Sequence, residues 1–288
     1  MTVSDEQNAR AEPSQKAVVE DKIMDWLETQ GTILELTVAS KFQKHLGFNS
    51  YARNVSHGRL YRTKDPITAE DKFREIDVVV RTTPITNVNQ SLSIWLIFEC
   101  KSRIKHPWIF YRSSESTNFG TKYEDAFLVL SNTKFDSKAI GGLHDVSLFN
   151  IERAPFSTGG VAALTKDFQE PTDSSRNSST NDSRNGVREA ILQVLSATEG
   201  VSKEIGLVSE GLIAAILVPI VVTKAPMFAV TLDELGTPKL ERIYRELVVT
   251  RSKLDDGKLK YVWVIHESQI DKLAKEFASA LSYIYLNL

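Results

Sequence analysis

Charged residues interrupt two apolar segments of this sequence, at positions where a buried strand is normally apolar. Residues 74–80 read Arg-Glu-Ile-Asp-Val-Val-Val, and residues 94–101 read Ile-Trp-Leu-Ile-Phe-Glu-Cys-Lys. A charged side chain that is buried without a partner is strongly unfavourable, so such residues persist where they are paired or bind a metal ion. Two carboxylates and a lysine at the ends of adjacent strands have the chemistry that a metal-dependent phosphodiesterase needs.

The spacing of these charges decides which of them can meet. Side chains alternate across a strand, so Glu99 and Lys101 share one face and lie about 7 Å apart. Asp77 lies beside Glu99 if the hairpin register permits, and two carboxylates so close repel each other unless a cation lies between them. Mg²⁺ binds one or two carboxylates, several waters and substrate phosphate, and Lys101 would then stabilise developing charge or assist the attacking water. The alternative is a cross-strand ion pair of Asp77 with Lys101, while Glu99 pairs with Arg74 or Arg103.

The residues Glu-Ile-Asp, a loop and then Phe-Glu-Cys-Lys resemble the motif of the PD-(D/E)xK nuclease superfamily, which has the restriction-endonuclease-like fold. The resemblance implies that Asp77 and Glu99 bind Mg²⁺ or Mn²⁺, and that Lys101 assists the nucleophile in phosphodiester hydrolysis. It also implies that the main-chain carbonyl of Cys100 is a further metal ligand. Ile76 replaces the proline of the motif, at a position that does not bind the metal.

Two residues on predicted helices complete the candidate site. Many members of the superfamily carry an acidic residue on the helix before the first core strand, some residues ahead of a glycine–aromatic pair. Glu35 precedes Gly47 and Phe48 at a comparable spacing, so the resemblance makes it the candidate for a fourth catalytic residue. Gln193, on a later predicted helix, is a further candidate to approach the site, as helix residues do in some members.

The charge of the chain is unevenly distributed. The whole sequence has a net charge of −2 and a pI near 6.3, which argues against a general polyanion binder. Residues 41–112 nevertheless carry 13 Lys and Arg against 6 Asp and Glu, a local net charge of +7. A locally positive face serves phosphate binding, although many of these charges could point elsewhere. Arg74, Arg103 and Lys105 flank the predicted site, so we expect a nucleic-acid substrate, double-stranded DNA rather than RNA, and a homodimer if both strands are cut.

Several classes of protein are excluded by what the sequence lacks. Cys100 is the single cysteine, so neither an intrachain disulfide nor a cysteine-rich zinc site can form. The five histidines have no HxH or HExxH spacing, and the chain has no P-loop and no G-x-S-x-G motif. Residues 1–15 contain no apolar signal-peptide segment, and the longest apolar run, residues 212–222, is too short to span a bilayer. We expect a soluble, cytoplasmic protein with no membrane partner.

The pattern of apolar residues predicts helices before, between and after strands, which is typical of an α/β protein. The predicted helices are residues 15–30, 32–45, 119–131, 187–198 and 268–285. The predicted strands are residues 51–61, 73–81, 92–101, 212–223, 227–232, 242–250 and 260–266, with a hairpin loop at 82–90 and an irregular stretch at 136–165. The expected fold class is α/β, with a restriction-endonuclease-like core in which helices flank a mixed central β-sheet.

We expect residues 1–14 to be disordered and residues 15–288 to form one restriction-endonuclease-like domain. The resemblance covers residues 31–103, so residues 104–186 would be an insertion. Its segment 167–186 is a low-complexity loop rich in Ser, Asn, Asp and Thr. Residues 224–288 would extend the domain with further strands and a helix.

Two other functions stay open at this point. A catalytically inactive restriction-endonuclease-like module would use the same acids in ion pairs and bind nucleic acid or a protein partner. Alternatively, residues 15–64 would form a helix-turn-helix with a β wing, although its helices lack a dense basic face. Trp108, Phe110 and Tyr111 lie among basic residues, so they would either stack bases or form a half-buried edge strand. His106 is a candidate phosphate contact.

Overall fold

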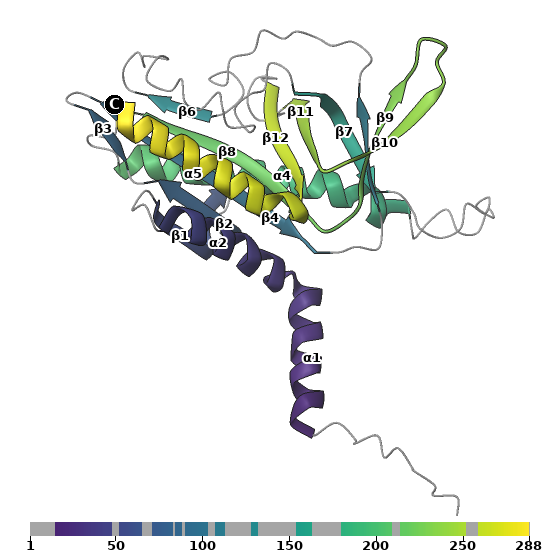
Figure 1. Cartoon of the computed structure of the whole chain (residues 1–288), viewed down its shortest axis with the longest axis horizontal. Coiled ribbons are helices and arrows are strands. Elements are labelled where there is room, and N and C mark those ends of the chain that lie inside the picture. The colour runs from purple at the N-terminus through teal and green to yellow at the C-terminus, as the bar shows by residue number, and fades with distance from the viewer. Residues whose placement is uncertain are drawn as a thin grey trace, which may run out of the picture.

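The computed structural model describes residues 15–47, 52–64, 71–82, 84–87, 90–102, 107–112, 128–131, 154–162, 180–208, 214–251 and 259–287. Over these residues the chain is an α/β protein in which helices flank one large mixed β-sheet (Figure 1). The helices are α1 (Gln15–Gln30), α2 (Thr32–Gly47), α4 (Thr180–Val208) and α5 (Ile270–Asn287), with the 3-10 helix η3 (Glu267–Gln269) leading into α5. None of these described helices combines the length and apolar composition that crossing a membrane requires.

Twelve strands form the sheet in the described part of the chain. They are β1 (Ala52–Lys64), β2 (Asp71–Thr82), β3 (Ile85–Asn87), β4 (Gln90–Lys101), β5 (Trp108–Arg112), β6 (Leu128–Ser131), β7 (Phe156–Ala162), β8 (Ala214–Thr223), β9 (Met227–Leu232), β10 (Pro238–Ile243), β11 (Arg245–Arg251) and β12 (Leu259–His266). Their order is β1-β2-β4-β8-β12-β11-β7-β5-β9-β10, with β3 paired to β4 and β6 paired to β8. Four of the pairs are parallel (β4–β8, β8–β12, β7–β11 and β5–β9) and the others are antiparallel, so the sheet is mixed.

The sheet curls back on itself. Residues 224–226 alone join β8 to β9, so the facing ends of these strands lie within about 15 Å, because consecutive Cα atoms are about 3.8 Å apart. Along the strand order, five strand spacings separate the same two strands, which is about 24 Å in a flat sheet. The backbone N–H of Trp108 donates to the carbonyl of Pro226 over 2.8 Å, and this bond holds the start of β5 against the connection.

Hydrophobic clusters on the two faces of the sheet hold the helices in place. The buried residues of α2 recur every four positions and are Leu34, Val38, Phe42 and Leu46. They pack with α5 against one face, where the ring of Phe42 lies 5.2 Å from that of Phe98 on β4 and 6.4 Å from that of Phe277 on α5. The apolar stripe of α4 covers the opposite face. β4 and residues 76–80 of β2 are therefore buried on both sides, which explains why most of these residues are apolar.

The structure corrects several predicted elements. Residues 128–131, predicted as the end of a helix, form β6 and pair antiparallel with β8, because an apolar segment this short is stabilised by its strand partner rather than by local helix propensity. Residues 156–162, predicted as irregular, form β7 between β11 and β5. The strand predicted at 242–250 is two strands, β10 and β11, with a bend at Tyr244. Residues 119–127, the rest of the helix predicted at 119–131, lie outside the described residues, as do residues 1–14.

The predicted insertion contributes to the sheet. Its strand β5 lies between β7 and β9, so the prediction of an edge strand at Trp108 to Arg112 is wrong. β7 requires glycine at position 160, because a Cβ on Gly160 would lie 2.8 Å from the ring of Phe110. α4 begins at Thr180, so the last residues of the predicted low-complexity loop are helical. At the other end of the chain, β1 is paired with β2 in the large sheet, rather than forming a separate wing.

Candidate active site

The candidate site lies where the ladder between β2 and β4 ends. The register pairs Arg81 with Trp95, Val80 with Leu96, Val79 with Ile97 and Val78 with Phe98. Asp77 and Glu99 hold the next position on each strand, so the register meets the condition under which the two carboxylates lie side by side. Oδ2 of Asp77 accepts a 2.6 Å hydrogen bond from the backbone N–H of Cys100, so a carboxylate satisfies this amide at the point where the ladder stops.

Lys101 forms hydrogen bonds to a residue of its own strand and to a residue of α4, the helix that covers this face of the sheet. Its Nζ donates to Oε1 of Glu99 over 2.6 Å and to Oε1 of Gln193 on α4 over 2.7 Å. Nε2 of Gln193 in turn donates to Glu189 over 3.4 Å. Lys101 thus pairs with Glu99 on its own strand, rather than with Asp77 across the ladder. The side chain of Cys100 points the other way, into the cluster that contains α2.

Glu35 reaches the same place from the first turn of α2. Its Oε2 is hydrogen-bonded to Nε2 of His57 on β1. Its negative charge contributes to the raised pKa values of Asp77, Glu99 and Cys100. A Cβ built on Gly31, at the start of α2, would lie 3.4 Å from Oγ of Ser102 and 3.8 Å from Oε1 of Glu35. The beginning of α2 therefore packs closely against the end of β4, and the structure brings together all four residues that the resemblance assigns to catalysis.

His57 is a site residue that the sequence did not reveal. It precedes Gly58, whose φ of 66° lies in the left-handed region that favours glycine. Gly58 lies opposite Asp77, between the register pairs His57–Val78 and Arg59–Ile76. The irregularity turns His57 toward α2 and Arg59 toward α4, where Arg59 forms a 2.8 Å ion pair with a glutamate. A glycine inside a strand pattern often marks such a distortion, so Gly58 was the sequence signal that could have pointed to His57 as a site residue.

Negative charge is in excess at the site. Burial raises the pKa of Asp77 to about 7, and the nearby Glu99 carboxylate adds to the rise. Burial also raises the pKa of Glu99, an effect that the Lys101 ammonium partly offsets and the Glu35 carboxylate reinforces. Burial, followed by the same carboxylates, holds the pKa of the Cys100 thiol well above its ordinary value, so this thiol is a neutral core group. Of the three carboxylates, Glu99 is bonded to Lys101 and Glu35 to His57, and a bound cation would relieve the repulsion that remains around Asp77.

The donor set agrees with a hard divalent cation in type and charge. Asp77 and Glu99 supply carboxylate oxygens on adjacent strands, and Mg²⁺ sites commonly use one or two carboxylates with waters and substrate phosphate. Among the described residues, no group of three or more His, Cys, Asp or Glu side chains is arranged to hold a metal ion. Any such site would therefore rest on the Asp77–Glu99 pair with main-chain and solvent oxygens, and Lys101 would have to yield part of the Glu99 carboxylate.

The predicted nucleic-acid contacts are only partly within the described structure. Arg103, Lys105 and the candidate His106 lie outside the described residues, as does the side chain of Arg74. The aromatic residues of β5 are described. Trp108 is 5% exposed and Phe110 is fully buried, so the interpretation of these two as base-stacking residues is wrong, because both belong to the core below α4. Tyr111 alone of the three is exposed.

Comparison with known proteins gives no relative from which a function could be carried over. The chain matches no protein-family model, no curated protein and no solved structure. The class of protein is therefore inferred from the site itself.

Proposed function

We propose that this chain is a metal-dependent nuclease with a restriction-endonuclease-like fold, which hydrolyses phosphodiester bonds in double-stranded DNA. The observation that carries the proposal is the convergence of Asp77, Glu99, Lys101 and Glu35 at the end of the β2–β4 ladder, with more buried carboxylate charge than Lys101 neutralises. Perturbed carboxylates that share a site with a fixed lysine are frequent in catalytic centres.

The order of elements around the site supports the proposed fold. A helix, α2, precedes three antiparallel strands that are neighbours in the sheet, β1, β2 and β4, and α4 leads into β8, which runs parallel to β4 (Figure 1). This is the succession expected from the sequence for the core and for the helix and strand that follow it. The site occupies the end of β4 at which α2 and α4 approach from opposite faces.

Each residue has a role that follows from its chemistry. Asp77 and Glu99 would hold Mg²⁺ or Mn²⁺, which supplies Lewis-acid stabilisation of the phosphate and lowers the pKa of water. Lys101 carries the positive charge that stabilises charge developing on the scissile phosphate, and Gln193 fixes the direction of its ammonium group. Glu35, held by a histidine, adds a further carboxylate beside the pair. The main-chain carbonyl of Cys100 remains the proposed additional oxygen donor.

Duplex DNA is the proposed substrate because phosphate contacts supply affinity that does not depend on sequence. Residues 41–112, which contain the site, carry a net charge of +7 in a chain whose overall net charge is −2. A nuclease that cuts both strands with one site per chain would act as a homodimer.

A catalytically inactive module of the same fold is the second candidate. The observation that favours it is the 2.6 Å contact between Lys101 and Glu99, which satisfies both charges without a metal ion. In such a module the carboxylates would be structural, and the chain would bind nucleic acid or a protein partner.

Cleavage of a substrate panel separates the two candidates. Supercoiled plasmid, linear duplex, branched DNA, single-stranded DNA and RNA are incubated with Mg²⁺ or Mn²⁺ and with wild type, Asp77→Asn or Asp271→Asn. Asp271 is a surface aspartate of α5, so its variant controls for the loss of one carboxylate. We expect cleavage of duplex DNA by wild type and Asp271→Asn, and none by Asp77→Asn. Equal cleavage by all three proteins, or none by any of them, would contradict the proposal.

A further inference from the structure

Strand β10 is an edge of the sheet over the part of the chain that the structure describes. It pairs with β9 and with no other described strand, and the hairpin of β9 and β10 projects beyond the body of the sheet (Figure 1). An exposed edge strand presents unpaired backbone N–H and C=O groups, which form a template for pairing with another chain. What this edge can pair with depends on which of its backbone groups point outward.

Alternate residues of β10 direct their backbone groups away from β9. The N–H of Asp233 donates to the carbonyl of Thr237 over 3.0 Å, so these two residues form a hydrogen-bonded pair at the turn. Such pairs alternate with non-bonded pairs along an antiparallel ladder, and the residues of the non-bonded pairs turn their backbone groups outward. By the register, the outward residues of β10 are Pro238, Leu240 and Arg242. A proline, which lacks the N–H, is tolerated at an edge position of this kind.

One face of the hairpin is apolar and exposed. Leu232 is 55% exposed and Leu240 is 64% exposed, and the register places both on the same face as Pro238. The opposite face carries Ala229, which is buried in the core. Exposed apolar side chains that gather on one surface mark an interaction site, whereas a single exposed leucine needs no explanation. The apolar surface of the hairpin thus lies beside its unpaired edge.

The charges of β10 favour one register of pairing with a second copy of the same strand. Lys239 and Glu241 flank Leu240 and lie on the other face of the hairpin. An antiparallel pair with its twofold axis through Leu240 places Lys239 of each copy opposite Glu241 of the partner subunit, and only axes through a residue keep outward backbone groups opposite outward ones. An axis through Lys239, Glu241 or Arg242 would bring two like charges opposite each other, which is unfavourable. An axis through Pro238 would lose both central hydrogen bonds.

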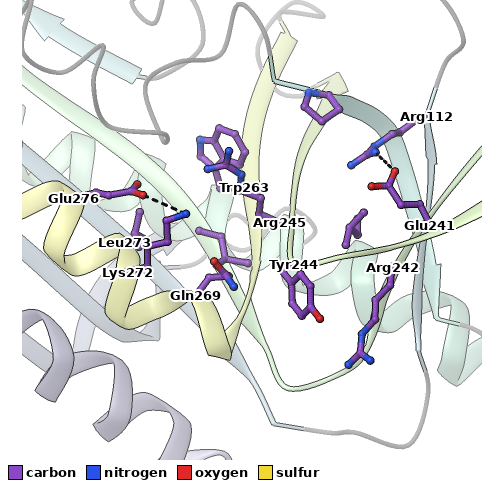
Figure 2. A pocket seen from close by; sticks show the side chains of 13 residues that line it. Arg112, Glu241, Arg242, Tyr244, Arg245, Trp263, Gln269, Lys272, Leu273 and Glu276 are labelled. Carbon is purple, nitrogen blue, oxygen red and sulfur yellow. Dashed lines mark hydrogen bonds and ion pairs between the residues drawn. The ribbon is translucent and has the colours of Figure 1, made fainter.

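Both charged side chains are accessible to a partner. The side chain of Lys239 is 70% exposed and that of Glu241 is 69% exposed. Nζ of Lys239 lies 3.8 Å from Asp233 in its own chain. The carboxylate of Glu241 lies 3.2 Å from Nη1 of Arg112, beside a cavity of about 350 Å³ at the β10–β11 bend (Figure 2). Ion pairs of such exposed side chains contribute little to stability, so they do not oppose a contact with a partner's charge.

We infer that two copies of this chain associate through β10, whose edges pair antiparallel about Leu240 and join the two sheets into one. The N–H of Leu240 donates to the carbonyl of Leu240 of the partner subunit, and the N–H of Arg242 donates to that of Pro238 of the partner subunit, each in both directions. A contact through one strand of six residues is at the low end of interface sizes, so the dimer dissociates at roughly 10 to 100 μM. This dimer goes beyond the proposed function, because it depends on no residue of the candidate active site.

Charge reversal tests the register. Lys239→Glu brings two glutamates together at both ends of the contact, and Glu241→Lys brings two lysines together. A mixture of the two variants restores opposite charges at both ends, because one copy then carries two acids and the other two lysines. Sedimentation velocity at about 10 to 300 μM should find that each variant alone dimerises at least roughly tenfold more weakly than wild type, and that the equimolar mixture recovers the dimer. Lys275→Glu, an exposed reversal on α5, should dimerise as wild type does.

A cysteine on the twofold axis gives a second readout. The Cα atoms of a hydrogen-bonded antiparallel pair lie about 5.5 Å apart, which a disulfide can bridge. Leu240→Cys should therefore form a disulfide-linked dimer in glutathione buffer. Leu235→Cys, at the hairpin tip, is the control for random collision, because the Leu235 side chain is 91% exposed, and it should stay largely unlinked. Cys100 is buried and does not compete.

Three results would overturn the inference. The first is a wild type that stays monomeric over the whole concentration range. The second is a wild-type dimer that neither charge reversal weakens, because another surface would then join the two copies. The third is disulfide linkage of Leu240→Cys no greater than that of Leu235→Cys. Cleavage by wild type that Asp77→Asn abolishes would uphold the proposed function in each of these cases, so the two proposals fail separately.

Discussion

Replacing Asp77 with Asn is predicted to stabilise the protein at pH 8 and to leave its stability unchanged below pH 4. An acid whose pKa is raised on folding holds its proton more tightly in the folded protein than in the unfolded chain. Unfolding then releases a proton between the two pKa values, so the free energy of unfolding falls as the pH rises through that interval. For Asp77 the interval runs from 3.8 in the unfolded chain to about 7 in the folded protein.

The size of the effect follows from the same interval. At about 1.36 kcal/mol per pH unit, the interval from 3.8 to about 7 sets an upper limit of about 4 kcal/mol. The neighbouring Glu99 carboxylate takes up part of the proton binding, and Asp77 keeps some contact with solvent, so we expect a gain of about 1 to 2 kcal/mol for the variant at pH 8. Asn can still accept the hydrogen bond from Cys100. The melting temperature should rise by about 2 to 8 °C.

Denaturant unfolding, followed by tryptophan fluorescence from pH 4 to pH 8 with EDTA present, measures this difference. Asp271→Asn is the control of opposite sign, because hydrogen bonds from Lys275 and His45 lower the pKa of Asp271. That variant should lose stability at neutral pH, and the loss should disappear only in strong acid. The reasoning is refuted if Asp77→Asn is less stable than wild type at pH 8, or if the difference between them is the same at pH 4 and pH 8.

Three further predictions concern other parts of the fold. Gly200→Ala should cost about 1 to 3 kcal/mol in a denaturant titration, because its Cβ would lie 2.2 Å from a ring carbon of a buried tyrosine, whereas Gly186→Ala, on the same helix with nothing within 4 Å, should gain about 0.5 to 1 kcal/mol. Glu246→Gln should cost about 3 kcal/mol at neutral pH in the same titration, because the Arg112 guanidinium would lose its buried partner. If the chain is a nuclease, Gln193→Ala should lower kcat about ten- to a hundredfold at unchanged melting temperature, since the lysine it holds would lose its direction.

The location of the candidate site was predictable from the sequence because it depends on local pattern. β2 and β4 are apolar segments joined by a short connection, so their antiparallel pairing and the neighbouring positions of Asp77 and Glu99 follow from strand geometry. The position of Glu35 was predictable for a similar reason, since it lies in the first turn of an amphipathic helix that must pack on the same sheet. In each case one periodic pattern determines which way the side chain points.

The features that the sequence did not predict depend on contacts between segments that lie far apart in the chain. The pairing of Arg112 with Glu246 joins residues 134 positions apart, and no local pattern relates them. β6 is a four-residue strand whose partner lies far along the chain, so its own sequence predicts a helix equally well. His57 faces Glu35 because the backbone at Gly58 adopts a left-handed conformation with a φ of 66°. The curl of the sheet likewise follows from the strand order and not from any one segment.

Binding of Mn²⁺ tests the proposed site most directly, because it requires no assumption about the substrate. Titration calorimetry at pH 7, in two buffers with different ionisation enthalpies, reports both the affinity and the protons released from carboxylates. We predict that wild type binds Mn²⁺ with release of protons, because metal and proton compete for Asp77, whose pKa is raised to about 7. Asp77→Asn should bind no Mn²⁺ at the same concentrations. Equal binding by the two proteins, or no binding by wild type, would contradict a metal site at Asp77 and Glu99.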